Sequence, residues 1–411
     1  MEKAGLFLPA TLVHARRMTA RSIHSPKHRV SIPRTTCSAK SETGTDNDAS
    51  QSAATLEEHG AIPQSNVSRG LVFDLGFPGS WDSHEVGSPV VKRFISDEEE
   101  RWYMWYHGSS GSRDSAGNLI DSIGLAVSSN GFHWERGSGP VESNKDAGLV
   151  MQCSSDWWAF DTVGVRPGEV VVMSSDKLRA SSAVYWLFYT GFCADGKNRS
   201  LPGLAMSQDG RHWARIEGEH HSGALFDVED EKSWDSSFVS NPQVVVHETG
   251  DLRMYYHSVD ARTGEVCIGV ARSRDGMKWI KLGKILGPGR KGCFDEGGVM
   301  NACVVKKKGG YLMAYEGVDS RRRGGVGIAE SADGMTNWKK MNDEEAVLEA
   351  SAAGWDSVSV GSPCVVEMDG GSGEWRVYYS GVGEDGRTGI GLALPEGGDF
   401  ATSMRRAAFP L

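Results

Sequence analysis

The stretch WDSHEVGSPVV (81–91), followed by WYMWYHG (102–108) and IGLAVSSNGFHW (123–134), is the first copy of a pattern that the chain repeats five times. Each copy opens with an aromatic residue and an aspartate, and a Val-rich run headed by Pro or Ala follows. The opening pairs are Trp81-Asp82, Phe160-Asp161, Trp234-Asp235, Phe294-Asp295 and Trp355-Asp356. An aromatic run and then a run of small residues complete each copy. Such repetition of one unit is the signature of a repeat architecture.

Each copy predicts four short antiparallel strands. Aromatic and β-branched runs favour strands, and the Asp-Gly or Asn-Gly that follows the third run in four copies favours a two-residue hairpin. The third-strand glycines that mark the period are Gly124, Gly203, Gly269, Gly327 and Gly391. Four-stranded sheets repeated five times around an axis predict an all-β fold, a five-bladed β-propeller over residues 70–394.

The two ends of the repeat complement each other. The fifth copy lacks an outer strand, whereas GLVFDLG (70–76) precedes the first copy as an orphan strand. We therefore expect residues 71–75 to pair with the last blade and close the ring, which would cover two sheet edges. The C-terminal tail, residues 395–411, has no counterpart in the repeat.

The N-terminal region differs in composition from the rest. Residues 1–40 hold eight Lys and Arg, one acid and many Ser and Thr, which predicts an organellar transit peptide, chloroplast (stroma) first and mitochondrion second. Residues 41–69 are polar and predict a disordered linker. Removing the +7 of residues 1–40 from the formal net charge of −10 leaves −17 for the remainder, which argues against nucleic-acid binding. No apolar run is long enough to predict a membrane span.

The repeat resembles the five-bladed propeller glycosidases, the arabinanase, levansucrase and invertase-like superfamily that includes glycoside hydrolase family 43. The resemblance covers roughly residues 70–394 and rests on the Trp-Asp pairs before x-Pro, the YY-type second strands and the S-x-D-G-x-x-W turns. It implies hydrolysis or transfer of glycosyl groups by paired carboxylates. In that superfamily the acid of blade one often directly precedes the Pro of the first strand. Here that position holds Ser88, Arg166, Asn241, Asn301 and Ser362, none of them acidic.

Residues that break the repeat at the mouth of the ring are the best site candidates, because first strands begin and second strands end there. The catalytic candidates are Asp82, Glu85, Asp161, Glu296 and Glu316. Glu316 is the strongest general-acid candidate, since it is the only acid that ends an aromatic run, although an ordinary surface carboxylate is an open alternative. The substrate-binding candidates are Arg166, His107, His257, Asn241, Asn301, Arg262 and Arg387. The repeated aspartates are expected mainly to cap backbone amides.

Basic residues occur in all five loops between second and third strands: Arg113, Lys197 with Arg199, Arg262, Arg321 to Arg323, and Arg387. They favour an anionic ligand such as a sugar phosphate or uronate, unless they pair with nearby acids. No cofactor is expected, and no ligand set indicates a metal. The sequence thus predicts a carbohydrate-active, glycosidase-like propeller of the plastid. The alternative is a non-catalytic module that binds a glycan, a sugar phosphate or a protein partner.

Overall fold

The computed structural model describes residues 69–408, apart from short gaps at 96–99, 115–116, 118, 138–143, 174–183, 194–198, 343, 369–373, 399 and 401–402. The predicted transit peptide (1–40) and nearly all of the predicted linker (41–69) lie outside the described residues. None of the helices in the described part is long and apolar enough to cross a membrane.

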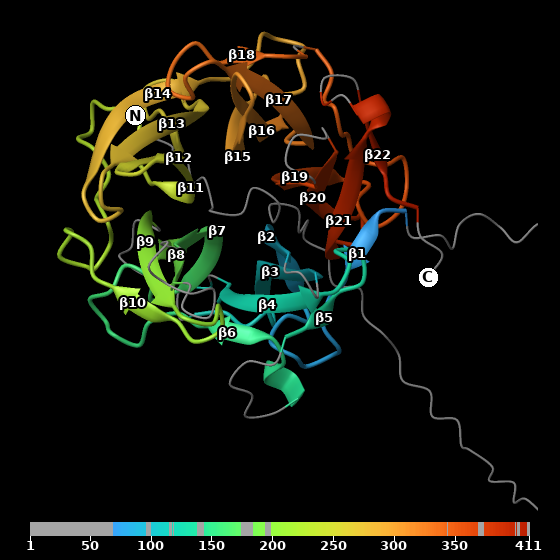
Figure 1. Cartoon of the computed structure of the whole chain (residues 1–411), viewed down its shortest axis with the longest axis horizontal. Coiled ribbons are helices and arrows are strands. Elements are labelled where there is room, and N and C mark those ends of the chain that lie inside the picture. Colours follow the sequence, from blue (N-terminus) through green and yellow to red (C-terminus); the bar gives the residue numbers. More distant parts are fainter. Residues whose placement is uncertain are drawn as a thin grey trace, which may run out of the picture. The chain divides into compact units, whose positions relative to one another are not determined.

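The described chain is built from antiparallel β-sheets with almost no helix, which confirms the all-β prediction. The strands form five groups in chain order (Figure 1). The first group consists of β2 (Glu85–Ile95), β3 (Glu100–Ser109), β4 (Ser122–Ser128), β5 (Glu135–Arg136) and β6 (Leu149–Met151). The second consists of β7 (Gly164–Met173), β8 (Val184–Phe192), β9 (Ser200–Ser207) and β10 (Ala214–Ile216). The third is β11 (Ser240–Glu248), β12 (Asp251–Val259), β13 (Val266–Ser273) and β14 (Trp279–Leu286). The fourth is β15 (Gly298–Lys307), β16 (Gly310–Val318), β17 (Gly324–Ser331) and β18 (Lys339–Lys340).

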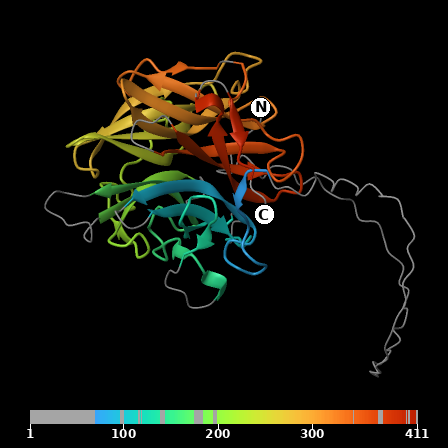
Figure 2. The same cartoon turned by 45° about the vertical axis from the view of Figure 1, so that its right-hand side comes forward.

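The fifth group contains strands from both ends of the described chain. It consists of β19 (Ser359–Glu367), β20 (Trp375–Val382) and β21 (Thr388–Pro395), with β1 (Leu71–Phe73) and β22 (Met404–Arg406) both paired to β21. Figure 2 shows the blue strand β1 beside the red strands of this group. The pairing predicted for residues 71–75 is therefore present over Leu71–Phe73. Part of the C-terminal tail, which had no predicted role, adds a strand to the same sheet.

The five groups form four sheets, because one parallel pairing of Val266 with Gly298 joins the third and fourth groups. None of these sheets closes on itself among the described residues. The first strands of the groups, β2, β7, β11, β15 and β19, lie nearest the common centre in Figure 1. Each contacts the first strand of the next group, and β19 contacts β2.

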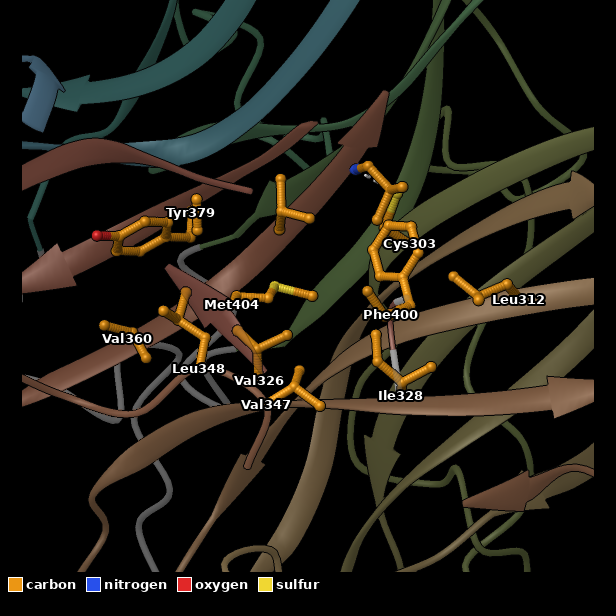
Figure 3. Packing of buried hydrophobic residues seen from close by; sticks show 14 residues of the cluster. Cys303, Leu312, Val326, Ile328, Val347, Leu348, Val360, Tyr379, Phe400 and Met404 are labelled. Carbon is orange, nitrogen blue, oxygen red and sulfur yellow. Dashed lines mark hydrogen bonds between the residues drawn. The ribbon is translucent and has the colours of Figure 1, made fainter. Parts of the chain in front are cut away.

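Apolar side chains fill the space between neighbouring groups. Figure 3 shows the cluster between the fourth and fifth groups, which includes Leu312 and Ile328 of the fourth group and Val360 and Tyr379 of the fifth. Phe400 and Met404 from the C-terminal segment belong to the same cluster. Because burial of apolar surface is the main stabilising term in folding, this segment is part of the folded core.

The repeated aspartates are scaffold residues. Asp82 is fully buried, and its Oδ2 accepts hydrogen bonds from the Tyr106 hydroxyl (2.9 Å) and from Arg136 Nε (2.8 Å) on the outer strand β5. The other four copies hold the same arrangement: Asp161 with Tyr189 and Arg215, Asp235 with Tyr256 and Lys281, Asp295 with Tyr315 and Lys340, and Asp356 with Tyr379 and Arg406. Each triad ties a second strand to an outer strand, and β22 supplies the cation of the fifth.

The Asp-Gly turns differ from the predicted two-residue hairpins. In the turn after β9, Gly210 has a φ of 73°, whereas Asp209 does not take a positive φ. Instead, Asp209 Oδ1 accepts the backbone N–H groups of Arg211 and His212, both at 2.9 Å. The two-residue hairpin prediction is wrong because the Asp side chain, not a second left-handed residue, closes the turn.

Candidate functional site

A ring of hydrogen bonds joins the five groups near the centre. The side chain that ends each second strand accepts a backbone N–H from the first strand of the next group at four of the five junctions. The donor–acceptor pairs are Asn241 N to Thr190 Oγ1 (2.8 Å), Asn301 N to His257 Nδ1 (3.4 Å), Ser362 N to Glu316 Oε2 (2.8 Å) and Ser88 N to Ser380 Oγ (2.9 Å). All four donor residues have left-handed backbone, with φ between 46° and 53°. Non-glycine residues adopt this conformation rarely, and such strain concentrates at functional sites.

The junction between the first and second groups breaks this ring. The strand register places Arg166 opposite Thr190, as Gly87 lies opposite His107 and Gly361 opposite Ser380. Pro167, one residue further along, therefore occupies the position of Ser88 and Ser362. The prediction that aligned Arg166 with those residues is wrong by one position. Since proline has no N–H, His107 receives no backbone donor from Pro167.

Four buried or nearly buried side chains occupy this junction instead. His107 Nε2 lies 3.1 Å from Glu85 Oε1, and the Arg166 guanidinium lies 3.6 Å from the same oxygen and 2.6 Å from Asp121 Oδ2. Glu85 is 5% exposed, and His107 and Asp121 are each 4% exposed. We call Glu85, His107, Asp121 and Arg166 the junction cluster. Burial lowers the pKa of Arg166, but Asp121 and Glu85 together raise it further, so the guanidinium remains charged.

The structure thus brings together three of the predicted site residues: Glu85, His107 and Arg166. Asp121 is the member that sequence reasoning missed. It lies just before β4, and its backbone oxygen accepts the Val165 N–H at 3.1 Å. Nothing in its local sequence distinguishes it from any other loop aspartate, because its partners Arg166 and Val165 come from β7.

Glu316 ends β16 in the same ring, at the junction between the fourth and fifth groups. Its Oε2 accepts hydrogen bonds from Asn301 Nδ2 and from the Ser362 N–H, both at 2.8 Å. A Cβ atom at Gly361 would lie 2.1 Å from this oxygen, so only glycine fits there. Burial raises the pKa of the Glu316 carboxyl more than these hydrogen bonds lower it. A carboxylic acid with a raised pKa is suited to donate a proton near neutral pH.

His257, Asn241 and Asn301 serve the neighbouring junctions. Burial lowers the pKa of His257 to about 4, which keeps its ring neutral at physiological pH. Its Nδ1 can then accept the Asn301 N–H. The Asn241 and Asn301 side chains point to the next first strand, with Asn241 Nδ2 3.4 Å from the Ala302 oxygen and Asn301 Nδ2 3.2 Å from Ser362 Oγ.

A small cavity lies between the five first strands. It is lined by Ser88, Pro167, Asn241, Asn301 and Ser362, together with Glu169, Gln243, Cys303 and Cys364 and their neighbours. Its volume of about 20 Å³ suits roughly one water molecule. Glu169 was not a sequence candidate, and its carboxylate is engaged by Lys92 (2.6 Å) and Gln243 Nε2 (2.8 Å).

The remaining catalytic candidates lie apart from this ring of contacts. Asp82 and Asp161 belong to the buried triads, where Oδ2 of each accepts a hydrogen bond from a tyrosine hydroxyl. Glu296 accepts the backbone N–H of Gly292 (2.5 Å) and of Ser320 (3.3 Å), and these bonds lower the pKa of its carboxyl. That arrangement closes a loop and does not favour proton donation.

The basic loop residues are largely paired with acids. Arg262 binds Asp260, Arg323 binds Asp319, and Arg387 binds Asp74. Arg199 lies 3.6 Å from Asp227, and Lys197 falls outside the described residues. These four cations follow the alternative interpretation, in which loop cations pair with neighbouring acids, whereas Arg113 donates to the Gly117 backbone oxygen.

One group of side chains in the described part has the spacing of metal ligands: His247, Glu248 and Asp251, whose ligand atoms lie within 4.8 Å of one another. The Asp251 carboxylate already binds Arg272 (2.8 Å) and Arg253 (3.2 Å). Two guanidinium groups would repel a cation at this position, so the cluster does not fit a metal.

Comparisons with known proteins give two sequence matches and many structural ones. No family model matches the chain. Two uncharacterised proteins of Mycobacterium tuberculosis, MT1551 (strain CDC 1551 / Oshkosh) and Rv1502 (strain ATCC 25618 / H37Rv), are each 30% identical over 249 residues, which is 58% of this chain and 73% of each relative.

The similar solved structures are glycosidase-like proteins. A protein described as a glycoside hydrolase has a TM-score of 0.58 at 16% identity and covers 84% of this chain and 95% of its own. A thermostable family-43 glycoside hydrolase has a TM-score of 0.55 at 16% identity, covering 79% and 95%. A β-1,2-mannobiose phosphorylase from Listeria innocua, solved with β-1,2-mannobiose, has a TM-score of 0.52 at 15% identity, covering 74% and 88%. At these identities the likeness establishes the fold relationship.

Proposed function

We propose that this chain, which belongs to the family of the Mycobacterium tuberculosis proteins MT1551 and Rv1502, is a five-bladed β-propeller. We further propose that it acts on a sugar at its central ring. Five strand groups, with first strands in contact from each group to the next and from the last to the first, support the propeller. The glycosidase-like neighbours support a carbohydrate ligand. Such folds bind ligands in the concave mouth at the centre.

The Glu316 carboxyl carries this proposal. It is held at the central ring by two hydrogen bonds, and burial raises its pKa, which are the properties of a general acid. In the proposed hydrolysis, Glu316 donates a proton to the glycosidic oxygen as the bond to the anomeric carbon breaks. A carboxylate of the junction cluster, Glu85, takes a proton from the attacking water. The Arg166 guanidinium lies 3.6 Å from Glu85 Oε1, whereas Glu316 is held by neutral amide donors, so the two carboxyl groups have different electrostatic surroundings.

Substitution of Glu316 tests this assignment. With a panel of 4-nitrophenyl glycosides, Glu316→Gln is expected to lower kcat at least 100-fold while sugar binding persists. Glu330→Gln is the matched control, because Glu330 lies at the other end of the same sheet, opposite Leu312, and pairs with Lys307. Undiminished turnover by the Glu316 variant would remove it as the proton donor.

A non-catalytic binding module is the second candidate function. It is favoured by the absence of an acid at any of the four left-handed ring positions and by Arg166, which engages both carboxylates of the junction cluster. In that case the wild-type protein binds a glycan, a sugar phosphate or a protein partner and shows no turnover with any glycoside of the panel.

We also propose that the protein works in the chloroplast stroma after removal of residues 1–40, with the mitochondrion as the second choice. The basic, acid-poor composition of these residues supports the proposal. Incubation of the full chain with isolated chloroplasts and mitochondria checks it. Protease-protected, shortened protein is expected in the chloroplasts, and its absence from both organelles would contradict a transit peptide.

A further inference from the structure

Each of the five first strands contributes one side chain to the central cavity at the same register. Each of these residues lies opposite the second-strand residue that is two positions before the end-of-strand side chain of the hydrogen-bonded ring. We call them the central residues, and they are Val90, Glu169, Gln243, Cys303 and Cys364. The position holds an aliphatic, an acidic and an amide side chain in three of the groups. The architecture of the ring therefore does not require the two neighbouring thiols.

Cys303 of the fourth group and Cys364 of the fifth are free thiols that lie together across the boundary between the two groups. The Cys303 Sγ accepts the backbone N–H of Val365, the residue directly after Cys364, at 3.3 Å. The Cys364 Sγ accepts the Val91 N–H at 3.2 Å. The two thiols also hydrogen-bond each other. The fold thus places two reduced sulfurs from different sheets in direct contact.

The surroundings make the two sulfurs unequal. The hydrogen bond from the Cys303 thiol, helped by the Val91 N–H and the nearby Lys92 ammonium, lowers the pKa of Cys364 although burial opposes this. The same hydrogen bond, together with burial, raises the pKa of Cys303. Because the thiolate is the reactive form of cysteine, Cys364 is the better nucleophile of the pair.

A small oxidant has access to this pair. Cys303 and Cys364 are each 8% exposed, and both line the cavity between the first strands. The cavity volume of about 20 Å³ accepts a molecule of roughly the size of water. Hydrogen peroxide is close to this size, whereas a peptide thiol or disulfide is far larger.

We propose that Cys303 and Cys364 form an oxidation site at which hydrogen peroxide creates a disulfide between the fourth and fifth strand groups. The Cys364 thiolate attacks one peroxide oxygen, the O–O bond breaks, and the released hydroxide takes up a proton to become water. The Cys303 sulfur then attacks the sulfenic acid on Cys364, and the hydroxyl group leaves with the Cys303 proton as a second water. The two sulfurs lose two electrons in total, and the peroxide gains them.

The disulfide acts on the surroundings of Glu316. Asn301 and Ser362 lie two residues before Cys303 and Cys364 in the same strands, and both donate to Glu316 Oε2 at 2.8 Å. A covalent S–S bond is shorter than a hydrogen-bonded contact, so oxidation draws the two strands together next to these donors. The oxidation does not depend on the proposed glycosidase function, whereas any effect on turnover does.

Peroxide treatment of the whole chain tests the site. The remaining thiols are blocked, the protein is digested without reductant, and the peptides are identified by mass spectrometry. We expect a Cys303–Cys364 cross-link in most molecules, which dithiothreitol returns to two thiols. Cys303→Ser and Cys364→Ser keep an acceptor for the Val365 and Val91 N–H groups and are expected to lose the cross-link. Cys267→Ser is the matched control, since Cys267 is buried and free in the third group. Valine, the central residue of the first group, replaces serine in any variant that does not fold.

A cross-link that only the Cys303 and Cys364 variants lose supports the site. Oxidation of Cys364 without a cross-link, cross-links confined to other cysteines, or unchanged thiols overturn it. Hydrogen–deuterium exchange of the Ser362 amide measures the effect on Glu316 without any substrate, and we expect exchange at least tenfold faster in the oxidised protein. Equal exchange in the two forms overturns this effect. Absence of glycoside turnover by the reduced protein contradicts the proposed function alone.

Discussion

The backbone N–H of Ser362 donates a 2.8 Å hydrogen bond to Oε2 of Glu316, across the boundary between the fourth and fifth strand groups. One carboxyl group therefore connects two sheets and is also the strongest proton-donor candidate of the ring. The bond favours the ionised form, whereas burial favours the protonated form and dominates, so the pKa of Glu316 is raised. Both roles of Glu316 consequently depend on pH.

The raised pKa of Glu316 gives a signed prediction for stability. A carboxyl whose pKa is higher in the folded chain binds its proton more tightly there, so its contribution to stability is full below the unfolded pKa and is lost as pH rises through the folded pKa. We expect Glu316→Gln to remove this loss, so that Tm of the variant rises relative to the wild type between pH 4 and pH 7. Thermal unfolding followed by circular dichroism at several pH values measures it. Parallel pH profiles of the two proteins would contradict the raised pKa.

His257 should change the pH dependence of stability in the direction opposite to that of Glu316. Burial lowers the pKa of His257 to about 4, so its contribution to stability is present above the unfolded pKa of about 6.5 and is lost as pH falls through the folded value. At about 1.4 kcal/mol per pKa unit, the loss amounts to roughly 3 kcal/mol below pH 4. His257→Gln should flatten the stability profile across this range. An NMR titration of the His257 ring with a midpoint near 6.5 would show that the prediction is wrong.

The buried triads predict that Asp82 and Asp161 contribute to stability as much as Asp235, Asp295 and Asp356 do. Removing one partner of a buried charge pair costs about 3–5 kcal/mol, so Asp82→Ala and Asp235→Ala should lower the free energy of unfolding by similar amounts. Urea unfolding measures both, and Asp230→Ala, at an exposed turn, is the control. If Asp82→Ala abolished turnover at unchanged stability, Asp82 would return to the catalytic candidates.

The first described strand is expected to matter for stability despite its length. Phe73 in β1 is 3% exposed and packs edge-on against Tyr106, with ring centroids 4.7 Å apart. Truncation of a buried Phe typically costs about 3–5 kcal/mol, so Phe73→Ala should lower the free energy of unfolding by about 3 kcal/mol. Phe77→Ala is the control, because Phe77 is 49% exposed. Equal unfolding midpoints for the two variants would mean that β1 contributes little.

The repeat made the strands predictable from sequence. The run IGLAVS (123–128) lies within β4 (Ser122–Ser128), and WYMWYHG (102–108) lies within β3 (Glu100–Ser109). Alternation, aromatic content and a fixed order of motifs are local properties, and five copies of them reinforce one another. The same repetition indicated that the Asp of each aromatic–Asp pair is scaffold, although its tyrosine and cationic partners were not identified.

Features that break the repeat were less predictable. The sequence pointed to Glu85, His107, Arg166 and Glu316, because each differs from its counterparts in the other copies. It misplaced Arg166 by one residue, since the register of β7 depends on pairing with β8 and not on the position of Pro167. Asp121 lies outside the repeated motifs. Arg406, in the C-terminal tail, completes the triad of Asp356 and Tyr379. The residues around it show no pattern that predicts a strand.

The shared use of β21 by β1 and β22 has a consequence for synthesis of the chain. Gly70 N donates to the Ala407 oxygen at 2.8 Å, and the Leu392 N–H donates to the Gly70 oxygen at 2.7 Å, so segments far apart in the sequence meet on one strand. Until residues 388–395 have been synthesised, Leu71–Phe73 lacks the strand with which it pairs in the folded chain. Pairing of β1 with β21 joins segments about 320 residues apart, and contacts between such distant segments are expected to form late in folding.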